Sequence, residues 1–247
     1  MGRSMKDNEL GRLSPLILAL DTPDLERAVE IAGEVKEHVD IVKVGLQLFS
    51  SEGPDAVRRL KYEGFEVFLD LKLNDIPNTV VSACLTLCEL EPLMLTLHAM
   101  GGQEMMRSAR RAVGERCSEA GVRRTLMIGV TVLTSLDLPA LKKIGVDYPV
   151  EEEVVRLAKL VRDSGLDGLV TSPLETRSVR RAVGEESILI TPGVRIARMD
   201  KDDQLRVATP GEAVRSGADF LVVGRPILTA EEPRKVAAEI LNDAGRH

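Results

Sequence analysis

Short apolar runs recur along the chain, separated by longer segments in which apolar residues repeat with the period of an amphipathic helix. The runs are rich in leucine or in β-branched residues, which is typical of strands buried on both faces. Eight of them are present, at residues 16–20, 41–45, 66–73, 94–99, 125–133, 168–172, 187–193 and 220–224. We expect each to form a strand.

The segments between the runs place apolar residues three or four positions apart, as the buried face of a helix requires. The clearest are residues 24–38, 77–90, 103–117 and 151–165, and a further one, 231–245, follows the last run. Strand and helix therefore alternate eight times. This order is typical of the α/β class, and eight units favour a single (β/α)8 TIM barrel over an open doubly wound sheet.

A single domain is expected. The chain has 247 residues, close to the roughly 250 that such a barrel needs, and no linker or change in composition divides it. We expect residues 15–247 to form the barrel and residues 1–14 to be a flexible N-terminal arm. Two connections, 134–150 and 194–209, are long enough to be lids.

Features that the sequence lacks indicate the cellular compartment and exclude several classes of protein. The arm has no apolar core of a secretory signal, and no apolar run reaches 18 residues, so we expect a cytoplasmic protein with no membrane span. The formal net charge of -6, with no Trp, two Tyr and four Phe, disfavours nucleic-acid binding. Cys84, Cys88 and Cys117 lack metal-site spacing, and we expect buried thiols.

The third run, FLDLKLND at residues 68–75, ends in charge. Strand side chains alternate between two faces, so Phe68, Asp70 and Lys72 share the face opposite to the leucines. Such a group is either a salt bridge that plugs the barrel or part of a site. Two carboxylates, Asp70 and Asp75, near one amine suit a cationic proton donor rather than a Schiff-base lysine.

Further polar residues stand where the other strands end, and barrel enzymes carry their sites at these ends. Lys43 lies within the second strand, where a buried ammonium needs an anion nearby. His98 ends the fourth strand, where we expect a hydrogen-bonded core histidine rather than a catalytic one. The others are Asp21 after the first strand and Thr131, Thr134 and Ser135 after the fifth.

The last two strands end in glycine turns, TPGV at 191–194 and VGRPI at 223–227. This is where the fold commonly binds phosphate. Gly193 and Gly224 allow close backbone approach, and Arg225 adds a guanidinium fork for phosphate oxygens. We therefore expect a substrate that ends in a phosphate. In the seventh connection, Arg195 and Gln204 are candidates to close over it, although Arg195 is equally well read as a solvated loop charge.

As a set, the motifs LALD, VKVG, DLKLNDIPNT, HAMGG, VTVLTS, TPGVR, DDQ and VVGRPI closely resemble those of the bacterial orotidine 5'-phosphate decarboxylase family. The resemblance covers residues 15–240. It implies decarboxylation of orotidine monophosphate (OMP) to UMP and CO2, the last step of de novo pyrimidine biosynthesis. It also implies that no cofactor or metal takes part, and that the enzyme is a homodimer with shared active sites.

The resemblance further implies a role for each matched residue. Lys72 would protonate C6 of the pyrimidine, and Asp70 would face the departing carboxylate. Asp75 and Thr79 would reach across the dimer interface into the partner's site. The remaining roles are ribose binding by Asp21 and Lys43, pyrimidine contact by Thr134 and Ser135, and phosphate binding by Arg195, Gln204, Gly224 and Arg225.

Two alternatives remain at this stage. The first is the group of sugar-phosphate decarboxylases and hexulose-phosphate synthases, which share the D-x-K-x-x-D pattern. This group looks metal-dependent and carries a glutamate on the second strand. This chain has Lys43 there, and an ammonium does not ligate Mg²⁺. The other alternative is a non-catalytic, phosphate-binding barrel, which the presence of Asp70, Lys72 and Asp75 disfavours.

Overall fold

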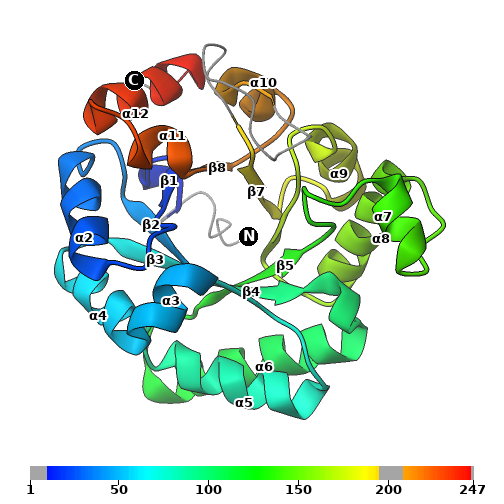
Figure 1. Cartoon of the computed structure of the whole chain (residues 1–247). Coiled ribbons are helices and arrows are strands. Elements are labelled where there is room, and N and C mark those ends of the chain that lie inside the picture. Colours follow the sequence, from blue (N-terminus) through cyan, green and yellow to red (C-terminus); the bar gives the residue numbers. More distant parts are fainter. Residues whose placement is uncertain (1–9, 195–207, 246–247) are drawn as a thin grey trace.

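The computed structural model describes residues 10–194 and 208–245. Eight parallel strands pair in chain order and close into a barrel, with β1 beside β8. Figure 1 shows this ring of strands surrounded by helices. The (β/α)8 barrel is thereby confirmed, and the open sheet is excluded. The strands are β1 (Leu16–Ala19), β2 (Ile41–Gly45), β3 (Glu66–Leu73), β4 (Met94–His98), β5 (Leu126–Val130), β6 (Gly168–Val170), β7 (Ile188–Pro192) and β8 (Phe220–Val223).

Helices connect the strands on the outside. The long amphipathic segments all form helices, whereas several short helices carried too few residues to show a period. The helices are η1 (Leu10–Arg12), α2 (Leu25–Glu34), α3 (Leu46–Glu52), α4 (Pro54–Tyr62), α5 (Pro77–Cys88), η2 (Ala99–Gly101), α6 (Gln103–Ala120), α7 (Leu138–Lys143), α8 (Val150–Asp163), α9 (Thr176–Val183), α10 (Pro210–Arg215), α11 (Arg225–Leu228) and α12 (Pro233–Asp243).

Residues 134–150, expected as a long connection, contain α7, whose N-cap Asp137 accepts a hydrogen bond from the Ala140 N–H. Most of the second long connection, 195–207, lies outside the described residues.

Strand side chains alternate between two apolar cores. One core fills the inside of the barrel and includes Phe68 of β3. The other lies between the strands and the helices and includes Val67 and Leu69. The expected separation along residues 67–73 is therefore confirmed: Asp70 and Lys72 line a cavity over Phe68, whereas the leucines pack against the outer core.

The N-terminal segment differs from the flexible arm expected up to residue 14. Leu10 is 6% exposed and belongs to the inner core, and Leu13 packs against the same core. The hydroxyl of Ser14 donates to the carbonyl of His38 over 2.6 Å. Residues 10–14 are thus anchored to the barrel through Leu10, Leu13 and Ser14, because the two leucines cover apolar side chains inside it. Residues 1–9 lie outside the described part of the chain.

The three cysteines are buried free thiols, as expected. Burial raises the pKa of Cys84 to about 12 and that of Cys88 to about 11. These thiols are packing groups rather than nucleophiles. Within residues 10–194 and 208–245, no helix is both long enough and apolar enough to cross a membrane.

We predict that Leu10→Ala destabilises the protein by about 2 kcal/mol or more, because it opens a cavity in the inner core. The measurement is the midpoint of chemical unfolding. Leu174→Ala is the control, since Leu174 is 58% exposed and its truncation should change stability by no more than about 0.5 kcal/mol. Equal midpoints for the two variants would contradict the packing of Leu10.

Candidate active site

Four charged side chains of alternating sign line up across the ends of β1, β2 and β3. We call them the charged row: Asp21, Lys43, Asp70 and Lys72. Strand register explains the arrangement, because Ala19 pairs with Lys43 and Gly45 pairs with Asp70. Lys43 Nζ lies 3.0 Å from Asp21 Oδ1 and 3.6 Å from Asp70 Oδ2. Lys72 Nζ lies 2.7 Å from Asp70 Oδ2.

Asp70 is the central member of the charged row, with only 9% of its side chain exposed. Burial by itself raises the pKa of this carboxyl. The charges of Lys43 and Lys72, together with hydrogen bonds from Lys72 and Thr96, outweigh burial and hold the pKa below its ordinary value. Asp70 is therefore a carboxylate at neutral pH, and one of its oxygens holds the Lys72 ammonium at the barrel mouth.

The backbone at Lys72 is unusual. Its φ is 51°, in the left-handed region that residues other than glycine rarely adopt. The pairing of β3 with β4 shifts register between Leu69 and Leu73. Within this shift, the Lys72 N–H donates to Thr96 Oγ1 over 2.8 Å, and Thr96 Oγ1 donates to Asp70 Oδ1 over 3.1 Å.

Two cavities open beside the charged row. The first, of about 190 Å³, is lined by Asp70, Lys72 and Thr134 over an apolar floor that includes Phe68. The second, of about 160 Å³, is lined by Gly193, Gly224, Arg225 and Asp21. Both cavities are also lined by Lys43, Pro192 and Val222. The charged strand and the two glycine turns, which are far apart in the sequence, thus form one continuous site.

Two glycines allow groups of the site to approach one another. A Cβ on Gly224 would stand 3.3 Å from Ala19 Cβ and 3.4 Å from Asp21 Oδ2, so the end of β8 lies close to the first carboxylate. A Cβ on Gly45 would stand 2.8 Å from Lys43 Nζ and 3.3 Å from Asp21 Oδ1. Gly45 therefore leaves room for this ion pair.

Comparison with known proteins agrees with this geometry. The model of the "Orotidine 5'-phosphate decarboxylase / HUMPS family" matches residues 14–240. The chain belongs to this family. The orotidine 5'-phosphate decarboxylase of Moorella thermoacetica is 47% identical over 230 residues, covering 91% of each chain. That of Syntrophotalea carbinolica is 46% identical over 228 residues, covering 92% of this chain and 93% of the relative.

A solved structure shares the fold of this family member. The crystal structure of orotidine 5'-phosphate decarboxylase from Lactobacillus acidophilus superposes with a TM-score of 0.81 at 34% identity, covering 93% of this chain and 98% of the other. The similarity spans the barrel end to end. The family resemblance inferred from the motifs is confirmed.

Some of the expected family residues lie outside the two cavities. Asp75 and Thr79 are exposed near the start of α5, and neither lines either of the two cavities beside the charged row. Asp75 Oδ1 accepts a hydrogen bond from the Ile76 N–H over 2.6 Å. Ser135 is exposed and does not line either cavity, in contrast to Thr134. Arg195 and Gln204 lie outside the described residues.

His98 differs from the hydrogen-bonded core histidine that we expected. Its Nδ1 is buried and has no hydrogen-bond partner within residues 10–194 and 208–245. Burial and the charge of Lys72 lower the pKa of His98, although Asp70 raises it in part. The imidazole is therefore neutral at neutral pH.

Thr96 and Gly45 are site residues that the motif analysis did not single out. Thr96 lies between Met94 and His98 on the inward face of β4, so strand alternation alone contained a signal for it. Thr131, by contrast, is buried and donates to the carbonyl of Val170 over 2.9 Å, which is a structural role at the barrel wall.

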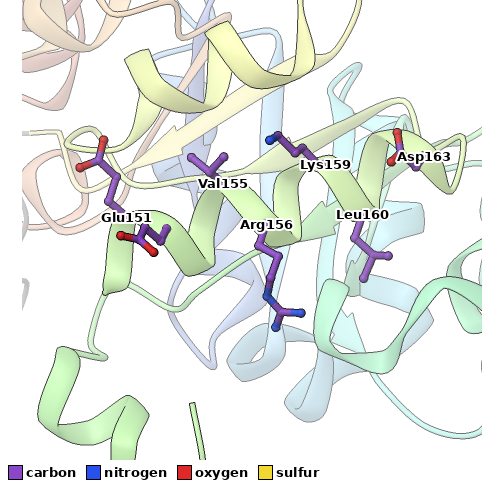
Figure 2. A pocket seen from close by; sticks show the side chains of 7 residues that line it. Glu151, Val155, Arg156, Lys159, Leu160 and Asp163 are labelled. Carbon is purple, nitrogen blue, oxygen red and sulfur yellow. The ribbon is translucent and has the colours of Figure 1, made fainter. Parts of the chain in front are cut away.

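Another hollow lies outside the barrel, along α8. Figure 2 shows its labelled side chains spread along one helix, with Val155 and Lys159 directed to one side and Arg156 and Leu160 to the other. Arg156 is already paired with Glu153 over 2.8 Å. Because these charges are solvated or paired, the barrel mouth is the better candidate for the active site.

We predict that Gly45→Ala folds normally but displaces the Lys43 ammonium. The backbone at Gly45 has φ -96° and ψ -173°, which alanine adopts without strain, whereas the new Cβ requires Lys43 Nζ to move by a few tenths of an ångström or more. A crystal structure and a thermal unfolding midpoint measure the two effects. Gly33→Ala is the control, since no atom lies within 4 Å of the Cβ that alanine would add there. If Lys43 Nζ did not move in Gly45→Ala, the conclusion that Gly45 leaves room for the Lys43 ammonium would be wrong.

Proposed function

We propose that this chain is a cytoplasmic enzyme that decarboxylates OMP to UMP and CO2, the last step of de novo pyrimidine biosynthesis. The observation that carries the proposal is the charged row beside two joined cavities, in a chain 47% identical to an orotidine 5'-phosphate decarboxylase. No cofactor enters the proposed reaction, because the Lys72 ammonium supplies both the positive charge and the proton.

The two cavities suit the two ends of a nucleotide. The cavity between the glycine turns would take the phosphate, with the Arg225 guanidinium as its cationic partner. The cavity over Phe68 would take the flat pyrimidine, whose edge Thr134 would contact. Asp21 and Lys43 lie where the two cavities meet and would bind the ribose hydroxyls. In the seventh connection, Arg195 and Gln204 would add to the phosphate grip.

The chemical step follows from the charges. The bond between C6 and the carboxylate breaks, CO2 leaves, and the electron pair stays on C6 until the Lys72 ammonium donates its proton there. A fixed ammonium stabilises this developing carbanion more than it stabilises the ground state, which is the condition for catalysis. Asp70 positions the Lys72 ammonium through a hydrogen bond of 2.7 Å from Lys72 Nζ to Asp70 Oδ2. Asp70 would also face the substrate carboxylate, so like-charge repulsion is a second effect of the same group.

We further propose a homodimer that brings Asp75 and Thr79 of one subunit to the site of the other. Both residues are exposed. At the same end of the barrel, large apolar side chains follow three consecutive strands: Leu46 after β2, Ile76 after β3 and Met100 after β4, which are 59%, 67% and 47% exposed. Exposed apolar groups at one end of the barrel favour an interface between copies of the chain.

Lys43 separates the proposal from the metal-dependent sugar-phosphate enzymes, which carry a glutamate at this position. Here an ammonium lies 3.0 Å from Asp21 and 3.6 Å from Asp70, and it cannot ligate Mg²⁺. A non-catalytic phosphate-binding barrel is disfavoured because it has no need of a row of paired charges built around the buried Lys43 and Asp70.

We predict that Lys72→Ala lowers the turnover of OMP by at least about 10³-fold, because it removes the group that stabilises and protonates C6. UMP binding should stay within about tenfold of the wild type, since the phosphate cavity is intact. Loss of OMP absorbance measures turnover, and calorimetry measures binding. Lys159→Ala, an exposed lysine on α8 (Figure 2), is the control. Near-normal turnover by Lys72→Ala would reject the proposed mechanism.

A further inference from the structure

The segment that carries Asp70 and Lys72 is not an ordinary strand. Leu69 pairs with Leu95, and the next pair joins Leu73 with Leu97, so four steps along β3 accompany two steps along β4. The extra residues form a bulge, and bulges redirect side chains near active sites. Lys72 lies within it at φ 51°, a conformation that costs a non-glycine residue about 1–2 kcal/mol. Something must hold the bulge in this form.

Thr96 of β4 makes the contacts that do so. Its hydroxyl accepts the Lys72 N–H over 2.8 Å and donates to Asp70 Oδ1 over 3.1 Å. The single hydroxyl proton is thus committed to Asp70, and one lone pair is committed to Lys72. Thr96 is 0% exposed, and its β-branched side chain is restricted to few rotamers. One rigid side chain therefore fixes the backbone of the ammonium and the orientation of the carboxylate together.

We propose that Thr96 is a positioning residue for decarboxylation, acting on Lys72 through its backbone and on Asp70 through its carboxylate. This inference rests on the proposed function. Thr96 does not itself line the cavity beside the charged row, so it does not meet the substrate. Without its hydroxyl, the Lys72 N–H and Asp70 Oδ1 each lose a partner, the bulge relaxes, and the ammonium no longer lies where charge develops on C6.

The test compares Thr96→Val, which keeps the shape and removes the hydroxyl, with Thr96→Ser, which keeps the hydroxyl and removes a methyl group. We expect Thr96→Val to lower kcat about 10- to 100-fold, the usual effect of misplacing a catalytic group by about 1 Å, with KM for OMP within about threefold. Thr96→Ser should keep kcat within about threefold. A purely structural role predicts the reverse order, because valine preserves packing better than serine.

Thr125→Val is the matched control. Thr125 is also a buried threonine, and its hydroxyl donates to the carbonyl of Pro92 over 3.0 Å, next to the start of β5 and away from the charged row. It should lower the unfolding temperature without lowering kcat. If Thr125→Val lowered kcat as much as Thr96→Val, the proposal would be overturned, because a general loosening of the barrel would explain the loss of activity in both variants.

Crystal structures of the variants give a readout that does not depend on activity. In Thr96→Val, we expect Lys72 to leave the left-handed region and the Nζ–Oδ2 distance to Asp70 to lengthen. If the wild type shows no decarboxylation, the proposed function fails, whereas an unchanged bulge in Thr96→Val overturns the positioning role alone. If Thr96→Val does not fold, Thr96→Cys replaces it. Its thiol is a weaker donor and should give an intermediate kcat; wild-type kcat would count against the role.

Discussion

The structure of this site depends on one buried carboxylate. Asp70 stays charged inside the barrel only because Lys43, Lys72 and the Thr96 hydroxyl surround it. An unpaired carboxylate in such surroundings would lose several kcal/mol of solvation and take up a proton instead. The dependence is mutual, because the two ammonium groups would repel each other without the anion between them. Removal of any partner therefore disturbs the whole charged row.

The barrel makes this arrangement possible. Lys43 and Asp70 belong to the consecutive strands β2 and β3, and Asp21 follows β1 beside them. The parallel register brings the ends of these three strands to the same level. The apolar inner core below them excludes water from the lower part of the barrel, which strengthens each charge interaction above it. Closure between β8 and β1 then places the Gly224 turn beside Asp21. In the proposed reaction, a nucleotide would extend from the charged row to the Gly224 turn.

Much of this organisation could be predicted from the sequence. Alternation in residues 67–73 separates Asp70 and Lys72 from the leucines because strand side chains alternate with a period of two. The bulge at Lys72 could not be predicted, since it depends on the register between β3 and β4 and on a hydroxyl 24 residues away. Thr96 itself is an ordinary strand residue by type.

Other features escaped sequence reasoning for similar reasons. Leu10 lies in a polar segment, and its role appears only when the barrel closes over it. Gly45 resembles any glycine at the end of a strand until the distance to Lys43 is known. Asp75 and Thr79 are exposed in the single chain, so their proposed role depends on a second copy, and the sequence suggests it only through the family resemblance.

The most direct test of the account is the pKa of Asp70, measured by ¹³C NMR titration of the side-chain carboxyl groups and assigned with Asp70→Asn. An Asp70 carboxylate held between two ammonium groups should titrate below the value of an unperturbed aspartate, about 3.9, because Lys43 and Lys72 outweigh burial. The stability gained from the ionised group would then be lost only as the pH falls through that lowered value. A midpoint at or above the unperturbed value would show that burial prevails, and the account of the charged row would be wrong.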